Sequence, residues 1–427
     1  MTRERMNVPL LAALLAIVAA PALAASRTAC VHLQLRDDRY NCAATTEAGA
    51  LRGCNRGGYV DAVGHQVELW DKDTSGGDEY IGTWYLAGGG TQCMTFEWEN
   101  AAYAKGEADP DVYIRYINLV NRIGFSNYVR VKAVNKDGGD HGATTWRNGQ
   151  PGDPDRYVAR NCRAGTTCYM FAAGALVPSN DIASERAQRI MALDSAQHTL
   201  QVFGEMMDRH AQLRFPGKAD CPTSCATDRA NFHINGSQGG DGILVGHELG
   251  HLIQMQQFQQ DDLRNDCSKG GNGWSLTSDE HESCATQEGF ASYIGVVSWY
   301  QPHSAATQPF GSSLDFDRAQ PDRSTCAANK GIPLQVGKAF WDMDDWNNES
   351  GAGAASSWDD DLSYGTTGLA QGWGVFPNGS GNRQNDESGQ DGVNMRDYYW
   401  NNTGRYTDAR FFETFIQHNC LQDQSND

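Results

Sequence analysis

The sequence predicts an α+β protein in which an N-terminal antiparallel β-sandwich precedes a mainly helical domain. Before residue 134, short segments alternate apolar and polar side chains and are separated by glycine-rich turns, as in β-sheets. After residue 180, apolar residues recur at intervals of three and four, as in helices that pack on a core. With 427 residues and 40% hydrophobic positions, the chain is long enough for about two to three domains.

The first 24 residues have the organisation of a secretory signal peptide. Arg3 and Arg5 precede an apolar run over residues 8–20, and Ala22 and Ala24 form a small-residue cleavage motif. The apolar run is too short to span a bilayer comfortably, and no later stretch is long and apolar enough to do so. We therefore expect cleavage after Ala24 and a secreted chain, extracellular or periplasmic, without a membrane anchor.

Five segments fit short strands of a sandwich over residues 25–150, namely 66–70, 80–86, 93–98, 112–119 and 129–134. The fragments VELWDKD, EYIGTWYLAGG and DVYIRY resemble those of small transthyretin-like sandwich domains. Glycine, asparagine, aspartate and proline dominate residues 137–154, which is typical of a linker or a long surface loop. We therefore place a domain boundary at residue 150, with the second domain over residues 151–427.

The second domain begins with a predicted helix that leads toward a second one. Ser179 precedes apolar residues with helical spacing up to residue 207, which predicts a helix of about 30 residues. Residues 230–234 then alternate like a short strand, and residues 236–242 form a flexible turn into the second helix.

Charge and cysteine content restrict the partners and the compartment. The net charge of −19 disfavours nucleic acid and anionic lipid as partners. Twelve cysteines in a secreted chain predict up to six disulfides. The connectivity stays open, although Cys162 with Cys168 and Cys221 with Cys225 are expected local pairs.

The chain contains neither a G-x-S-x-G motif nor a P-loop, so a serine hydrolase or an NTPase is not supported.

The second helix carries the residues with the clearest chemistry. Residues 243–253 read ILVGHELGHLI and contain the motif H-E-x-x-H within an apolar segment. On a helix, His247 and His251 project from one face, one turn apart, and their imidazoles can share one Zn²⁺. Glu248 lies beside the first histidine and is the natural general base for activating a water molecule.

A catalytic zinc ion usually has three protein ligands and one open position. We favour Glu288 as the third ligand, at the start of a helical stretch that runs to about residue 299, because Gly289 would let this helix approach closely. Four other residues follow the zinc helix and are rival ligands, unless they form an exposed acidic loop: Asp279, Glu280, His281 and Glu282.

The segments HELGH and EGFASY together resemble the gluzincin metallopeptidases. The resemblance implies a zincin-like fold over residues 151–427, zinc ligands His247, His251 and Glu288, and Glu248 as general base. It departs from the family in spacing, because 36 residues separate His251 from Glu288, about twice the thermolysin-like number. A disulfide between Cys267 and Cys284 could brace this insertion.

Three further features bear on this resemblance. Ser292 stands where thermolysin-like enzymes carry an aspartate that orients a ligating histidine. Residues 338–344 resemble a late gluzincin helix whose aromatic and aspartate side chains pack behind the active site. The oxyanion donor is expected in the C-terminal half, where the candidates are Tyr364, Tyr398, Tyr399, Tyr406 and His418, and we select Tyr399.

Acidic clusters at residues 71–79, 342–345 and 359–361 are expected to be solvated rather than to bind calcium.

These observations predict a secreted, disulfide-braced zinc metallopeptidase that hydrolyses protein or peptide substrates. The alternative is a secreted binding or adhesion protein in which the sandwich is the functional part and the zinc site is structural or degenerate. Glu248 distinguishes the two, since a structural site has no need for a general base.

Overall fold

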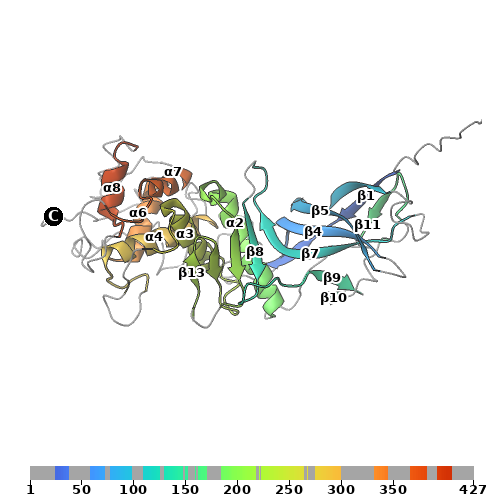
Figure 1. Ribbon diagram of the computed structural model, residues 1–427, viewed down its shortest axis with the longest axis horizontal. Coiled ribbons are helices and arrows are strands. Elements are labelled where there is room, and N and C mark those ends of the chain that lie inside the picture. Colours follow the sequence, from blue (N-terminus) through green and yellow to red (C-terminus); the bar gives the residue numbers. More distant parts are fainter. Residues whose placement is uncertain are drawn as a thin grey trace, which may run out of the picture.

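The computed structural model contains both strands and helices, in agreement with the α+β class (Figure 1). It describes residues 25–37, 58–72, 77–98, 109–125, 129–147, 150–151, 159, 162–170, 184–217, 221, 223–263, 267, 275–299, 331–344, 366–381 and 392–405. Strands gather at one end of the molecule in Figure 1 and most helices at the other, with α2 between them. The predicted signal peptide lies outside the described residues.

The first eleven strands precede residue 170. They are β1 (Ala25–Val31), β2 (Gln34–Asp37), β3 (Gly58–Asp61), β4 (Val63–Asp71), β5 (Glu79–Ala87), β6 (Gln92–Trp98), β7 (Val112–Asn121), β8 (Arg130–Val134), β9 (Thr144–Arg147), β10 (Gln150–Pro151) and β11 (Thr167–Tyr169). The five strands expected from alternation are present as β4 to β8, and burial alternates most clearly in β4, β6 and β8.

The remaining elements follow α2 (Glu185–Phe203). They are η1 (Gly204–Met206), β12 (Ala211–Arg214), β13 (Cys225–Asp228), β14 (Asn231–His233), α3 (Gly242–Phe258), α4 (Glu282–Val297), α6 (Pro333–Asp344), α7 (Thr366–Gln371), η4 (Gly372–Val375) and α8 (Met395–Asn402). Strand β14 lies within the strand predicted over residues 230–234.

A nine-stranded sheet joins strands from both sides of residue 150. Its order is β10-β9-β7-β8-β12-β14-β13, and β4 pairs with β7 and β5 beside this path. The connection is the parallel pair of β8 with β12, in which Val131 lies opposite Ala211. Smaller sheets contain β11-β1-β6 and β2-β3. The sheet hydrogen bonds therefore run from the N-terminal strands directly to the strands beside α3.

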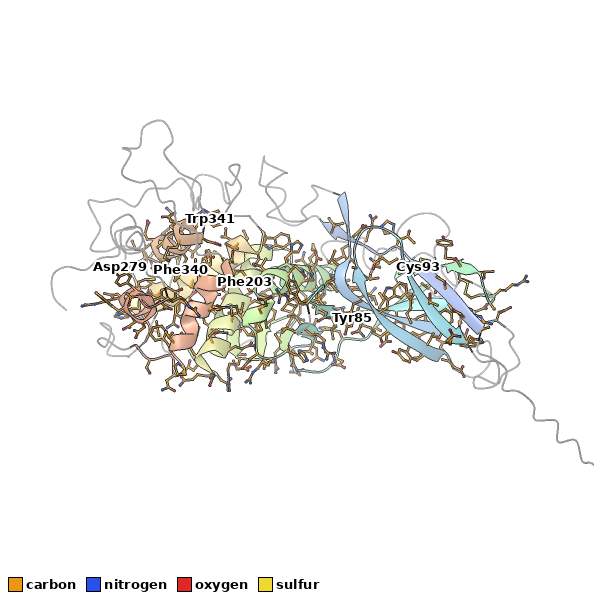
Figure 2. All side chains as sticks on the ribbon, turned by 90° about the horizontal axis from the view of Figure 1, so that it is seen from above. Tyr85, Cys93, Phe203, Asp279, Phe340 and Trp341 are labelled. Atoms are coloured by element: carbon orange, nitrogen blue, oxygen red, sulfur yellow. A yellow bond between two sulfur atoms is a disulfide. The ribbon has the colours of Figure 1, made fainter. Side chains whose placement is uncertain are left out.

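The buried side chains form two clusters. One lies between the three-stranded sheet and the large sheet, with Phe96 and Ile114 among its members. The other lies between the large sheet and the helices and includes Phe203, Phe340 and Trp341. Figure 2 shows these last three residues among the helices, whereas Tyr85 and Cys93 lie in the strand-rich part.

Helix α2 is shorter than predicted. It contains 19 residues and begins after Ser184, whose hydroxyl accepts a hydrogen bond from the backbone N–H of Ala187 at 3.2 Å. This N-cap satisfies a free backbone donor and fixes the start of the helix. Ser179, the expected start, lies outside the described residues. At the other end, the chain tightens into η1 after Phe203, so the predicted length of about 30 residues was wrong.

Helices α3 and α4 approach each other through residues that lack bulky side chains. A Cβ atom at Gly246 would lie 2.8 Å from the Cα of Gly295, and one at Gly250 would lie 2.8 Å from the Cα of Ala291. The expected role of Gly289 in this approach was wrong, because its missing side chain faces Pro333 and Val336 of α6. Helix α3 begins after Asp241, which accepts a hydrogen bond from the N–H of Leu244 at 3.1 Å.

Four disulfides connect described cysteines: Cys30–Cys93, Cys162–Cys168, Cys221–Cys225 and Cys267–Cys284. The three pairs suggested by the sequence are therefore confirmed. The other four cysteines, at positions 42, 54, 326 and 420, lie outside the described residues. Such bonds form and persist in oxidising compartments. Within the described part of the chain, no helix is long and apolar enough to cross a membrane.

The contact between α3 and α4 gives a first testable prediction. Replacing Gly250 with alanine places a methyl group against the backbone of Ala291, so we expect the free energy of unfolding to fall by about 1–3 kcal/mol. Gly368→Ala is the matched control, because a Cβ there meets no atom within 4 Å. Denaturant unfolding compares the two variants. Equal stability would contradict the close helix contact.

Candidate metal centre

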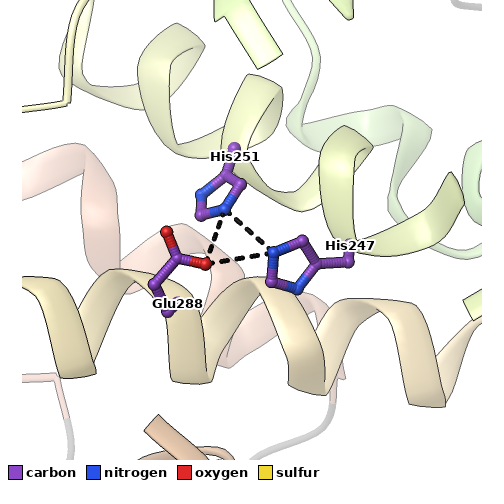
Figure 3. A group of neighbouring side chains, drawn as sticks. All are labelled: His247, His251 and Glu288. Atoms are coloured by element: carbon purple, nitrogen blue, oxygen red, sulfur yellow. Dashed lines mark hydrogen bonds and ion pairs between the residues drawn. The ribbon is translucent and has the colours of Figure 1, made fainter. Parts of the chain in front are cut away.

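Three side chains from α3 and α4 converge at one point (Figure 3). The Nε2 atoms of His247 and His251 each lie 3.1 Å from the same Glu288 oxygen, Oε2, and 3.1 Å from each other. All three side chains are buried, with exposed fractions of 8%, 6% and 6% for His247, His251 and Glu288. The structure thus brings together the three residues that the sequence selected, in a group that could hold a metal ion.

The arrangement follows from the helix geometry. His247 and His251 are four residues apart on α3, so their imidazoles lie one above the other on the face toward α4. Glu288 reaches the same point from α4 because the glycine contacts hold the two backbones close together. Glu288 lies six residues inside α4 rather than at its start, since the helix begins at Glu282 after the extended residue His281.

The donor atoms fit a divalent transition metal. Two imidazole nitrogens and one carboxylate oxygen form a ligand set of the catalytic zinc type. In a tetrahedral site with ligands about 2.0–2.2 Å from zinc, donor atoms lie about 3.3–3.6 Å apart. The observed separations of 3.1 Å are within a few tenths of an ångström of this spacing.

Glu288 and His251 shift each other's pKa values. Burial alone would raise the pKa of Glu288, but the nearby His251 and His247 lower it to about 2. Burial alone would lower the pKa of His251, but the Glu288 carboxylate raises it to about 9. Glu288 is therefore held in the ionised form that metal ligation requires.

Glu248 is next to the ligands but belongs to a different environment. Its side chain is buried, and burial raises its pKa, with the Glu288 charge acting in the same direction. The backbone N–H of Ala226, in β13, forms a hydrogen bond with its carboxylate. Glu248 is thus outside the three-residue metal group and lies between α3 and strand β13.

Each histidine is held from behind by an uncharged side chain. His247 Nδ1 lies 3.1 Å from the hydroxyl oxygen of Ser292, and His251 Nδ1 lies 3.3 Å from Oε1 of Gln254. The sequence resemblance had drawn attention to Ser292. It missed Gln254, although its position three residues after His251 places it on a neighbouring part of the helix surface.

The rival ligands do not join the metal group. Asp279 is exposed, and Glu282 lies in the first turn of α4. The expectation of an exposed loop over residues 279–282 was wrong for Glu280, which is 1% exposed. Its two carboxylate oxygens have no hydrogen-bond partner among the described residues.

The expected solvated acidic clusters contain buried residues. Asp71 is buried and accepts a hydrogen bond from the N–H of Asp111 at 2.7 Å. Asp344 is also buried and accepts hydrogen bonds from the hydroxyls of Tyr293 and Thr366, each at 2.7 Å. The solvated description was therefore wrong for Asp71 and Asp344, because internal donors replace water. Residues 359–361 lie outside the described residues.

The oxyanion candidates are only partly described. The Tyr398 hydroxyl donates to the carbonyl of Leu369 at 2.6 Å, so this side chain is engaged in the core. Tyr399 packs edge-on against Trp400. Its selection as oxyanion donor stays a prediction, and three other candidates, Tyr364, Tyr406 and His418, lie outside the described residues.

Comparisons with known proteins assign no family. No protein-family model and no curated protein matches the chain. A solved structure with some similarity is a 9R-lipoxygenase from Cyanothece, at 15% identity and a TM-score of 0.19. The match covers 46% of this chain and 24% of the lipoxygenase, and at this score it carries no argument about fold or function.

The metal group gives a second prediction. Glu288→Ala removes a donor atom, so we expect zinc affinity to fall by more than about 100-fold, the upper end of the effect of losing an outer-shell partner. Glu282→Ala, on the same helix but outside the group, should leave the affinity unchanged. Competition with a chelator measures the affinity, and thermal unfolding checks the fold. The reverse order of effects would assign the third ligand to Glu282.

Proposed function

We propose that this chain is a secreted zinc-dependent peptidase of gluzincin type, with an N-terminal sandwich followed by a zincin-like catalytic domain. The observation that carries the proposal is the buried convergence of His247, His251 and Glu288, with the carboxylate of Glu248 beside this group and outside it. Disulfides among the described residues support an oxidising compartment and therefore secretion.

The ligand set supports zinc and a catalytic role. Structural zinc sites are closed by four protein ligands, whereas catalytic sites have three and keep one position open. The described residues supply three, two of them imidazoles. A bound zinc ion supplies Lewis-acid polarisation of a carbonyl group and of a water molecule.

Glu248 performs the proton transfers in this proposal. As the water oxygen bonds to the scissile carbonyl carbon, the Glu248 carboxylate accepts one of the water protons. When the C–N bond breaks, Glu248 returns this proton to the departing amine nitrogen, so that one water molecule is consumed and the carboxylate is regenerated. The raised pKa of Glu248 favours the first step, because it makes the carboxylate a stronger base.

Strand β13 supports a peptide as the substrate. It lies at the end of the strand order and has β14 as its neighbour among the described strands. An extended peptide can pair with such an edge through backbone hydrogen bonds. Because the N–H of Ala226 in this strand contacts Glu248, a peptide on this edge would run past the general base.

Replacement of Glu248 tests the proposed function. Glu248→Gln keeps the size of the side chain but removes the base, so hydrolysis of denatured casein should fall by at least about 100-fold while zinc stays bound. Glu282→Gln is the matched control and should retain activity, and a chelator should abolish the wild-type activity.

Near-normal hydrolysis by Glu248→Gln would contradict the mechanism. A wild-type protein that binds one zinc ion and cleaves no denatured protein or peptide would instead favour the binding or adhesion protein with a structural site.

A further inference from the structure

The two residues behind the histidines have their own hydrogen atoms committed elsewhere. The hydroxyl of Ser292 donates to the backbone carbonyl of Glu288 at 2.8 Å. The side-chain Nε2 of Gln254 donates to the backbone carbonyl of Gln287 at 3.3 Å. A hydroxyl has one proton, so Ser292 can only accept from His247, and the amide orientation leaves Gln254 Oε1 to accept from His251.

These constraints determine which ring nitrogen carries the proton in each histidine. Since both partners act as acceptors, each imidazole donates through Nδ1, and in the neutral form that binds a metal the lone pair is on Nε2, which lies at the metal group. The two receiving carbonyls belong to consecutive residues of α4, and one of these residues is Glu288 itself. One helix thus supplies a ligand and orients the other two.

We propose that Ser292 and Gln254 are positioning residues that fix both zinc-binding imidazoles as Nδ1–H tautomers, and that they do so without adding negative charge. The inference rests on the proposed function only in taking zinc as the metal. A carboxylate in place of either residue would make the imidazole more basic. The imidazole would then bind the metal more tightly through Nε2. The uncharged pair therefore orients the ligands while leaving the site less negative.

Burial makes this orientation effective. Ser292 is 5% exposed and Gln254 is fully buried, so water does not readily replace either partner. Removing one of them takes away the side chain that accepts from the imidazole N–H and loosens the orientation of the ring. The cost should appear in metal binding, because the ligand must be reoriented when the ion enters.

Zinc affinity of four variants tests the proposal. Ser292→Ala and Gln254→Ala should each weaken zinc binding by about 10-fold to 100-fold in competition with a chelator. Ser298→Ala is the matched control, because Ser298 is also buried, at the C-cap of α4, and its hydroxyl donates to the carbonyl four residues earlier, Ile294, at 2.7 Å. Ser292→Thr keeps the hydroxyl and should restore affinity to within a few-fold of wild type.

A spectroscopic measurement separates orientation from general destabilisation. In the zinc-loaded wild-type protein, ¹⁵N NMR of the two imidazoles should show protonated Nδ1 and metal-bound Nε2. In Co²⁺-loaded protein, Ser292→Ala should change the visible absorption spectrum, whereas Ser298→Ala should not.

Wild-type affinity in both alanine variants, or protonated Nε2 in the NMR spectrum, would overturn the proposal. Equal losses in Ser292→Ala and Ser298→Ala would overturn it as well, since a merely structural role predicts that result. Hydrolysis is not part of this test, so an inactive protein would contradict the peptidase function and not the positioning role.

Discussion

The candidate site depends on one steric constraint, the close approach of α3 and α4. Side chains are absent at Gly246, Gly250 and Gly295, so the two backbones are near enough for ligands from both helices to meet at 3.1 Å. The same approach brings the carbonyl groups of α4 within reach of the residues behind the histidines. The ligand set and its orientation both follow from this contact.

The pKa values of two carboxylates of one helix pair are shifted in opposite directions. Glu288 faces two imidazoles, which lower its pKa despite burial, whereas burial raises the pKa of Glu248. When two carboxylates of one site have pKa values shifted apart, one stays ionised as a ligand and the other can accept and release a proton. The roles proposed for the two residues therefore match their pKa shifts, although both glutamates interact electrostatically with the same two histidines.

Local sequence patterns predicted the parts of the structure that depend on near neighbours. The spacing of His247 and His251 requires only a helix, and strands β4 to β8 require only alternation. The selection of Glu288 relied on Gly289 and on a family resemblance, since the contact of Glu288 with the histidines spans α3 and α4. The start of α2 was misplaced because the N-cap is Ser184, and the true contact of Gly289 with α6 depends on packing that periodicity does not encode. The pairing of β8 with β12 had no sequence signal.

That pairing has a consequence for how the chain can fold as it is synthesised. Val131 and Ala211 are opposite each other but 80 residues apart in the sequence, from 211 − 131. Until residues 211–214 have emerged, β8 has an open edge, and unpaired edges recruit other strands. Contacts of this range also form slowly. Completion of the N-terminal strands must therefore wait for the start of the helical region, so the order of synthesis couples the two ends of the sheet.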